Sequence, residues 1–473
     1  MKSKRQTVGL TLAQSSSDTV DLDSELEIDQ LLPLIRTPEV QTALDGPFRT
    51  AGSISRLSWE VLAEIFTTCV EERYSDYQSI PEDFSDDSFK IWEPIQNPKN
   101  ITTVLSSISR QWRKIAIGTS QLWTHLHIQR FDSSTSSEHR TSYIQWLASF
   151  IRIWIERSRT QQLDIRMNEC GPPFRQAIDL ILVPQMERCY RFERYNVFGP
   201  CIYTAVPTPV LREALVSVME GPNPRIGSIF PKSPLLKSLK VVTDSCHFNL
   251  FPLRFPHLTY LNLDTGGMVF GVKLDDLLSK LHVCSHSLEM LRLNYIDLDG
   301  GSPKSVSLPN LHTLQIQQPM LLLHFTRLDS LENLRWSFVE FNVGELLVIH
   351  QVAPCLRHLN IFSSDGHRCD VDERVFILGV NALTELRTLL IDGLKIGSQT
   401  LDAFASSEPP ICPKLTKLKI LRSSSIGTWD FEAMLHERRS RNTADGTPAL
   451  LIEADMGFEK WDFNQYVTSY STS

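Results

Sequence analysis

Apolar residues recur with helical spacing in three stretches of the N-terminal third of the chain. In residues 54–66 the apolar residues lie four and five positions apart. Ser58 suits a helix N-cap, and Glu60 lies in the first turn, where the helix dipole favours a carboxylate. Residues 101–117 form a second stretch, which Gly118 follows as a stop signal, and residues 143–157 form a third. This spacing predicts three amphipathic helices.

The pattern is weaker between these helices and residue 232. Alternation of apolar and polar residues predicts short strands at 122–128 and 163–165, and a helix is expected at 209–219. Residues 1–51 show no sustained period, and one short helix near residues 22–32 is the only element expected there.

From residue 233 onward the chain repeats the pattern Leu-x-x-Leu-x-aliphatic. Successive copies begin roughly 20–30 residues apart, the period of a leucine-rich repeat. The second and third apolar positions face a shared core, and the residue between them faces the other side of a strand. One copy cannot bury its own apolar face, so the copies must stack. The copies begin at Leu236, Leu258, Leu288, Leu311, Leu331, Leu356, Leu386 and Leu415.

Details around the repeats refine this prediction. Proline precedes several copies, as in Pro256-His257-Leu258, and suits the residue just before a strand, where its missing N–H costs no ladder bond. The asparagine ladder of a typical repeat is absent. Residues 278–283 are expected to be a helix leading into the next copy, and residues 449–453 a closing strand. The pattern predicts an irregular α/β leucine-rich-repeat solenoid of parallel strands, horseshoe-like in outline.

Composition narrows the class of protein. The chain has 473 residues, 42% of them hydrophobic and 22% charged, which is typical of a globular protein. It has no apolar run of membrane-spanning length and no signal peptide, and its nine cysteines without CxxC spacing indicate buried thiols in a reducing compartment. We therefore expect a cytoplasmic or nuclear location, or both, and no membrane partner.

The net charge of −8 is concentrated in one block. Residues 71–93 carry eight acidic residues against two basic ones, which is typical of a solvated insertion. A protein that binds nucleic acid usually carries an excess of basic residues, and this sequence has no such excess. We therefore expect no nucleic acid as a partner.

Motifs that carry catalytic or metal chemistry are missing. The sequence has no phosphate-binding loop, no dinucleotide-binding glycine motif and no nucleophile elbow. His282 and His286 have helical spacing without the glutamate of a zinc-protease motif, and His125 and His127 share one face of a short strand. We expect no metal, no cofactor and no catalytic activity in the chain itself.

The helical module resembles an F-box domain, similar to those of the large F-box families of mushroom-forming fungi. The resemblance rests on residues 54–66 and 108–116, extended by 119–123, and covers about residues 52–128. Ser58 stands where the family usually has proline, and an acidic insertion at 71–100 separates the first helix from the rest.

F-box proteins are substrate receptors of SCF-type ubiquitin ligases. Their helices dock on a Skp-type adaptor, which links them to cullin and RING subunits. The resemblance implies an N-terminal all-α F-box module followed by the solenoid. It also implies adaptor-facing or core roles for Leu57, Ser58, Val61, Leu62, Ile65, Phe66, Leu105, Ile108 and Trp112.

These predictions divide the chain into five parts. Residues 1–51 are a loose lead segment and 52–128 the F-box-like domain. Residues 129–232 are linking helices and the first strands of the solenoid, 233–456 the leucine-rich-repeat domain and 457–473 a tail.

The leading functional hypothesis is a non-catalytic receptor subunit that recruits a protein substrate through its repeats. The alternatives are a leucine-rich-repeat interaction scaffold that binds the adaptor without directing ubiquitin transfer, and an unrecognised enzyme. Cations are frequent, and acids absent, at the exposed strand positions Lys240, Asn262, Arg292, Gln315, Arg335, Asn360, Leu390 and Lys419.

This row of positions leads to three hypotheses. It recognises an acidic or phosphorylated segment of a substrate, because arginine can fork two hydrogen bonds onto one anionic group. Alternatively the acidic block at 71–93 occupies it, or it binds nothing and is simply a solvated sheet.

Overall fold

The structure is a computed structural model. The residues that it describes are 57–75, 101–128, 137–168, 172–197, 206–218, 230, 232–243, 255–265, 270–299, 305–317, 320–338, 341–363, 368–406, 411–421, 432–434, 436–437, 451–455 and 460–461. The expected lead segment, most of the acidic insertion and most of the C-terminal tail lie outside these residues.

The chain divides into two units, each with its own core. Unit 1 comprises Met1–Asp86 with Pro98–Thr119, and unit 2 comprises Asp87–Asn97 with Ser120–Ser473. The F-box-like domain was expected to extend to residue 128. In the structure Ser120 and all later residues belong to unit 2, because residues 125–128 form the first strand of its sheet.

Unit 1 has three described helices: α3 (Trp59–Ser75), α4 (Ile101–Ile108) and α5 (Arg110–Gly118). Ser58 caps α3 as expected, since its hydroxyl accepts the Val61 N–H at 3.4 Å. One helix was predicted for residues 101–117. The structure breaks it at Ser109, whose extended backbone and hydroxyl cap α5 through the Trp112 N–H at 3.1 Å.

Apolar side chains from all three helices form the core of unit 1. Leu62, Phe66 and Leu105 are buried there, and the Phe66 ring lies 4.6 Å from the Trp112 ring, centroid to centroid. The three helices therefore hold together through side chains on adjoining faces.

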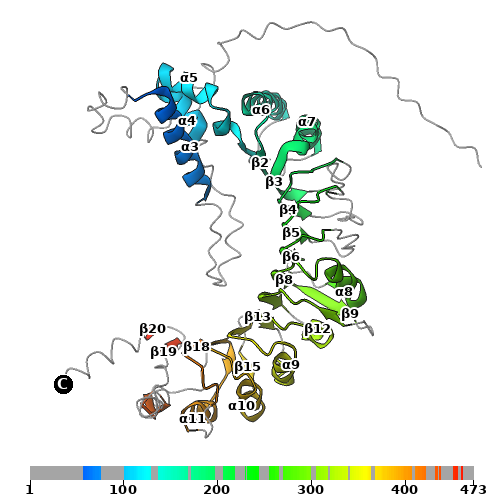
Figure 1. Ribbon diagram of the computed structural model, residues 1–473, viewed down its shortest axis with the longest axis vertical. Coiled ribbons are helices and arrows are strands. Elements are labelled where there is room, and N and C mark those ends of the chain that lie inside the picture. Colours follow the sequence, from blue (N-terminus) through cyan, green and yellow to red (C-terminus); the bar gives the residue numbers. More distant parts are fainter. Residues whose placement is uncertain are drawn as a thin grey trace, which may run out of the picture. The chain divides into compact units, whose positions relative to one another are not determined.

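Unit 2 contains a 14-stranded sheet in which neighbouring strands are parallel except for the last pair (Figure 1). Strand order follows chain order, as in a solenoid whose repeats stack on their neighbours. Its strands are β1 (His125–Ile128), β2 (Leu163–Asn168), β3 (Cys189–Val197), β4 (Glu213–Val218), β5 (Ser238–Thr243), β6 (Tyr260–Asp264), β8 (Met290–Asn294), β11 (Thr313–Gln317), β13 (Asn333–Phe338), β14 (His358–Ser363), β16 (Thr388–Asp392), β18 (Lys417–Leu421), β19 (Leu451–Asp455) and β20 (Lys460–Trp461).

The segments between the strands are irregular, as the missing asparagine ladder predicts. Helices lie along one side of the sheet: α6 (Ser137–Ser158), α7 (Pro172–Leu182), α8 (Leu274–Val283), α9 (Gly344–Val352), α10 (Glu373–Asn381) and α11 (Ser398–Ser406) (Figure 1). Short 3-10 turns and two-stranded pairs replace them elsewhere: η4 (Ser120–Trp123), η5 (Val183–Arg188), η8 (Met320–Phe325), β7 (Phe270–Lys273) with β9 (Ile296–Asp299), β10 (Val306–Ser307) with β12 (Thr326–Arg327), and β15 (Cys369–Asp370) with β17 (Leu394–Lys395).

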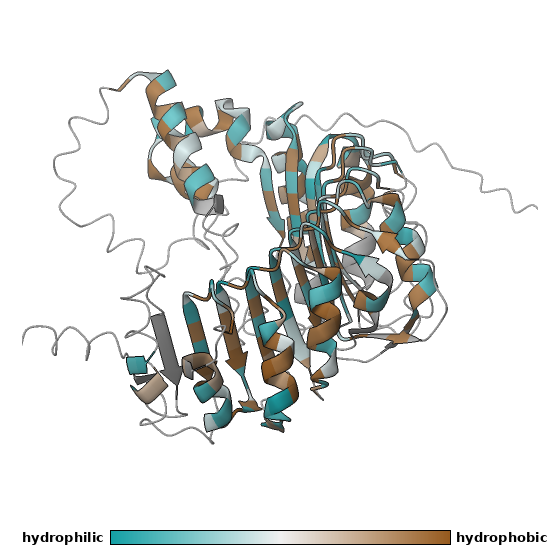
Figure 2. Ribbon diagram, turned by 60° about the horizontal axis from the view of Figure 1, so that its bottom comes forward, coloured by the Kyte–Doolittle hydropathy of each residue, from teal (hydrophilic) through white to brown (hydrophobic). Residues whose placement is uncertain are grey.

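Strands such as β8, β11 and β14 alternate between buried apolar residues and residues of the opposite face, and Figure 2 shows this alternation as brown and teal bands. The repeat leucines are buried in every copy and stack from strand to strand; Leu261, Leu291 and Leu314, for example, are aligned neighbours. The predicted helix within 278–283 and the closing strand near 449–453 are both confirmed, as α8 and β19.

The prediction for residues 209–219 was wrong. These residues hold β4 rather than a helix, and β4 pairs in parallel with β3 and β5. The Leu211 N–H bonds to the Thr208 carbonyl, the same turn that precedes Leu258, Leu311 and Leu356. Residues 208–216 are therefore a further repeat, with Ala214 at the usual leucine position.

Candidate functional site

The face of the large sheet opposite its helices is the candidate site, and we call it the open face. Its strands are paired with little shift in register, so equivalent outward positions align across the sheet. The central row consists of His127, Arg166, Glu193, Leu215, Lys240, Asn262, Arg292, Gln315, Arg335, Asn360, Leu390 and Lys419. The seven residues predicted to bind substrate all lie in this row.

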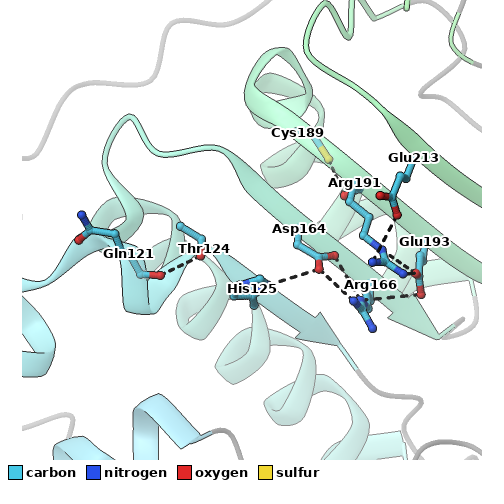
Figure 3. A network of polar contacts seen from close by, with 9 residues as sticks. All are labelled: Gln121, Thr124, His125, Asp164, Arg166, Cys189, Arg191, Glu193 and Glu213. Carbon is cyan, nitrogen blue, oxygen red and sulfur yellow. Dashed lines mark hydrogen bonds and ion pairs between the residues drawn. The ribbon is translucent and has the colours of Figure 1, made fainter. Parts of the chain in front are cut away.

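On the first four strands, charges of the open face compensate each other (Figure 3). Asp164 on β2 accepts two hydrogen bonds from the Arg166 guanidinium, at 3.1 and 3.2 Å, and a contact of 3.3 Å from His125 Nδ1 on β1. Arg191 on β3 donates to Glu193 Oε1 at 2.6 Å from Nη2. Acidic and basic groups alternate here across neighbouring strands.

The same network extends to β4 and lowers the pKa of Asp164. Arg191 Nη1 lies 3.3 Å from Glu213 Oε2, and Arg166 Nε lies 3.8 Å from Glu193 Oε2. Burial raises the pKa of Asp164, but hydrogen bonds from His125 and Arg166 and the arginine charge outweigh burial and lower that pKa to about 2. This part of the face is a self-neutralised structural network.

The middle of the open face, on β8, β11, β13 and β14, has a different composition, and we call it the cationic patch. Its twelve outward positions include Arg292, Arg335 and His358 and no carboxylate; the others are Met290, Asn294, Thr313, Gln315, Gln317, Asn333, Ser337, Asn360 and Phe362. The nearest outward carboxylate on an adjoining strand beside Arg292 is Asp264 on β6.

Aromatic rings position both guanidinium groups. The Arg292 Cζ lies 5.7 Å from the ring centroid of Tyr260 on β6, and the Arg335 Cζ lies 4.4 Å from that of Phe362 on β14. Each arginine therefore leans away from Gln315, which stands between them on β11. The ring contacts restrict the two side chains before any partner arrives.

Buried polar atoms without a hydrogen-bond partner gather in and beside this patch. They include Asn294 Oδ1, Gln315 Oε1 and Ser337 Oγ, and on the adjoining strand β6 Asn262 Oδ1, whose residue is 3% exposed. Burying a polar atom without a partner costs about 1–3 kcal/mol. Such atoms are unusual in a structural sheet and are expected where a ligand completes the hydrogen bonds.

Lys240 lies on β5, separated from the patch by β6, in a less solvated position. Burial lowers the pKa of its ammonium group, and Asp264 on β6 opposes that shift. At the other end Lys419 on β18 is half-buried. The cationic character of the central row thus continues beyond both sides of the patch.

In unit 1, the predicted adaptor-binding residues separate into two groups. Leu62 and Phe66 are 1% exposed and Leu105 is also buried, so these side chains form the core rather than a surface. Val61 and Ile65 are each 42% exposed and Ile108 is 41% exposed. Ser58 is exposed at the helix start, and Leu57 and Trp112 are half-buried.

Sequence reasoning missed two further exposed apolar residues of unit 1. Trp59 is 48% exposed and Ile117 is 37% exposed. Trp59 Cζ2 would lie 3.2 Å from a β-carbon placed on Gly118, so the indole packs against the end of α5 beside Ile117. The sequence did contain one sign of an exposed tryptophan. Trp59 directly follows the N-cap residue Ser58, and the first helical position often faces solvent.

Other candidates do not assemble into sites in the structure. His282 and His286 are both exposed, and His125 contacts Asp164. Among the residues that the structure describes, no group of three or more metal-ligating side chains occurs. The helices in the described part of the chain include none long and apolar enough to cross a membrane.

Comparisons with known proteins give weak structural likenesses. No protein family model matches the chain, and no curated protein matches its sequence. Among solved structures, an internalin from Listeria monocytogenes is similar with a TM-score of 0.35 and 14% identity, over 71% of this chain and 91% of that chain. The order of the parallel strands and the rows of buried leucines make unit 2 a leucine-rich-repeat-like solenoid.

Proposed function

We propose that the protein is a substrate-recognition subunit of an SCF-type ubiquitin ligase. Unit 1 would dock a Skp-type adaptor, and the open face of unit 2 would bind a protein substrate. Cullin and RING subunits would join through the adaptor, and the chain itself would contribute no catalytic group. The observation that supports adaptor docking is the apolar surface of unit 1, where Val61 and Ile65 share a helix face turned away from the core.

Burying this apolar surface would release enough free energy to bind a partner. Fully burying a valine or isoleucine side chain contributes about 1.5–3 kcal/mol. The exposed two-fifths of Val61, Ile65 and Ile108 would then contribute about 0.6–1.3 kcal/mol each, or about 2–4 kcal/mol together. That range corresponds to roughly 30- to 700-fold in affinity.

The test is co-purification of the full chain with a Skp-type adaptor. Val61→Glu with Ile65→Glu should weaken adaptor binding at least tenfold, because two charges would have to enter an apolar interface. Leu180→Glu with Leu378→Glu is the matched control, since these leucines are 69% and 63% exposed on helices of unit 2. Equal retention of the adaptor by both double variants would refute the proposal for this surface.

A second pair of variants separates interface from core. Leu62→Ala with Phe66→Ala removes two side chains that are 1% exposed, so it should unfold unit 1, seen as lost protection of α3 in hydrogen exchange. The glutamate variants should keep that protection. Ubiquitin-dependent loss of a bound partner then distinguishes a ligase receptor from a scaffold that binds the adaptor alone.

A further inference from the structure

We propose that the primary amides of the cationic patch bind the main chain of an extended, uncharged segment of the partner protein. These amides belong to Asn294, Gln315, Gln317, Asn333 and Asn360. This inference rests on the proposed function only in taking the open face as the substrate-binding surface. It names the conformation of the bound segment and the peptide groups as the atoms that are recognised.

The amino-acid composition of the patch carries the first step. Five of its twelve outward positions are asparagine or glutamine. Asparagine is depleted in β-strands, yet β8, β13 and β14 each place one on the open face. A sheet that only faced water would be served better by threonine, which is polar and favours strands. We therefore attribute the amides to binding.

Unsatisfied hydrogen-bond acceptors carry the second step. Asn294 Oδ1 and Gln315 Oε1 are buried and have no hydrogen-bond donor. The Asn294 amide nitrogen donates to Asp264 Oδ2 at 3.2 Å. Because a carboxylate only accepts, this bond fixes the orientation of the amide and leaves its oxygen for another donor.

Gln315 can present its oxygen to a ligand from the middle of the patch. Its side chain is half-buried, and the terminal torsion of a glutamine is broad, so a rotation turns the oxygen toward the surface. The N–H groups of an extended polypeptide are donors of the right kind. A primary amide can also donate to a peptide carbonyl, so it can bond both polar groups of a main chain.

The two arginines of the patch already have contacts within the sheet. Arg292 lies 5.7 Å from the ring centroid of Tyr260, and the carboxylate of Asp264 is on the adjoining strand β6. Arg335 lies 4.4 Å from the ring centroid of Phe362. The net charge of −8 also opposes the approach of a long polyanion. An uncharged segment therefore fits the patch better than a nucleic acid does.

The spacing of the strands sets the length of the bound segment. Each of β8, β11, β13 and β14 contributes at least one amide, and these four strands are consecutive in the sheet. At about 4.8 Å between strands, the patch is about 14 Å wide. An extended chain advances about 3.3 Å per residue, so about four or five residues cross all four strands.

The experiment uses the full chain and capped peptides of three, six and nine residues that repeat Ser-Val-Thr. A second nine-residue peptide carries N-methyl groups at alternate peptide bonds, which removes hydrogen-bond donors without changing charge. Nuclear magnetic resonance follows the side-chain amide signals of the protein, assigned by substitution, and a fluorine label on the peptide gives Kd for every variant. A single-stranded thymidine oligonucleotide of nine residues is included as a competing class of ligand.

The peptides should differ by length and by their N–H groups. The six- and nine-residue peptides should bind within twofold of each other, and the three-residue peptide at least tenfold more weakly, because it cannot cross the four strands. N-methylation should weaken binding at least tenfold, as expected when several hydrogen bonds are lost. Added salt should change Kd by less than twofold, since the peptide is uncharged.

The variants test the amides directly. Gln315→Leu with Asn360→Leu should weaken binding about tenfold, through the loss of two hydrogen-bonding side chains. The sheet accepts leucine at this position, because Leu390 is the aligned neighbour of Asn360 on β16. The control Asn381→Leu with Gln399→Leu makes the same changes at exposed positions of α10 and α11 and should stay within twofold.

Four outcomes would overturn the inference: no shift of the patch amide signals with any peptide, equal binding of the N-methylated peptide, unchanged binding by the leucine variant of the patch, or preferential binding of the oligonucleotide. Adaptor retention is measured on the same preparations. If the peptides fail while the adaptor is retained, the inference falls and the proposed function stands. If the peptides bind but the adaptor does not, the proposed function fails and the main-chain-binding site stands.

Discussion

Replacement of Asp164 tests whether the charge network on the first strands is structural. Its carboxylate is 1% exposed and accepts two hydrogen bonds from Arg166 and one contact from His125. Asp164→Asn keeps the size of the side chain but removes the charge that compensates a buried guanidinium. Because breaking a buried ion pair costs about 3–5 kcal/mol and Glu193 still lies 3.8 Å from Arg166, we expect a loss of about 2–3 kcal/mol at pH 7.

The same loss follows from the pKa of Asp164. The ordinary value is 3.8 and the folded value is about 2. This difference between the folded and ordinary pKa corresponds to about 2 kcal/mol. Since the folded pKa is the lower one, this stabilisation is fully present above pH 3.8 and is lost as the pH falls toward 2.

The assay is urea unfolding followed by far-UV circular dichroism at pH 7, 5, 4, 3 and 2.5, with the original chain and the variant in parallel. The difference between them should be constant from pH 7 to 5 and shrink below pH 4. Asp370→Asn is the control, because its carboxyl group is 86% exposed and pairs with Lys395 at the surface, so it should change stability by under about 0.5 kcal/mol. A difference that is absent at pH 7, or independent of pH, would refute this account of the network.

Two further changes probe the packing of unit 2 by the same unfolding assay. Gly379→Ala should destabilise the chain by about 1–3 kcal/mol, because the new β-carbon would lie 2.6 Å from Leu346 Cβ on α9; unchanged stability would contradict this contact. Asp179→Ala should cost about 3–5 kcal/mol, since it removes the carboxylate that lies 3.4 Å from the buried guanidinium of Arg194, a residue 3% exposed. Adding Arg194→Met should restore more than half of the loss, and failure to do so would argue against a buried charge as the cause.

The strands from β5 to β18 could be predicted because the repeat fixes both their location and their register. Each repeat has leucine at two positions and an aliphatic residue at a third. Only one strand register places these three side chains in the core, because a shift by one residue would turn them to the opposite face. The row from Lys240 to Lys419 follows from that register alone, without knowledge of the segments between the strands. The structure aligns all of these positions.

Strands β3 and β4 could not be predicted in the same way, because their core positions are not leucine. β4 has Ala214 and Val216, and β3 has Phe192 and Arg194. Arg194 is paired in the core with Asp179 on α7, a contact that no local pattern reveals. The turn at Thr208, with Pro209 after it, was the one visible sign of a repeat.

In unit 1 the sequence predicted the helix but not which of its apolar residues face the core. Successive residues of a helix differ by about 100°, so Val61 and Leu62 cannot point the same way. Both pairs, Val61 with Ile65 and Leu62 with Phe66, have the same spacing of four and the same apolar character. Packing against α4 and α5 decides between them, and only the second pair is buried.

Equivalent positions of the open face differ in their surroundings from one strand to another. Along the central row the position of Arg166 on β2 is equivalent to that of Arg292 on β8 and Arg335 on β13. Arg166 is 5% exposed and bonds to an acid of its own strand, whereas the two later arginines are half-buried and rest on aromatic rings. An arginine that bonds to a carboxylate contributes to stability, and an arginine against an aromatic ring is held in place by a cation–π contact. Equivalent positions in one register therefore differ in their surroundings according to the neighbours of each arginine.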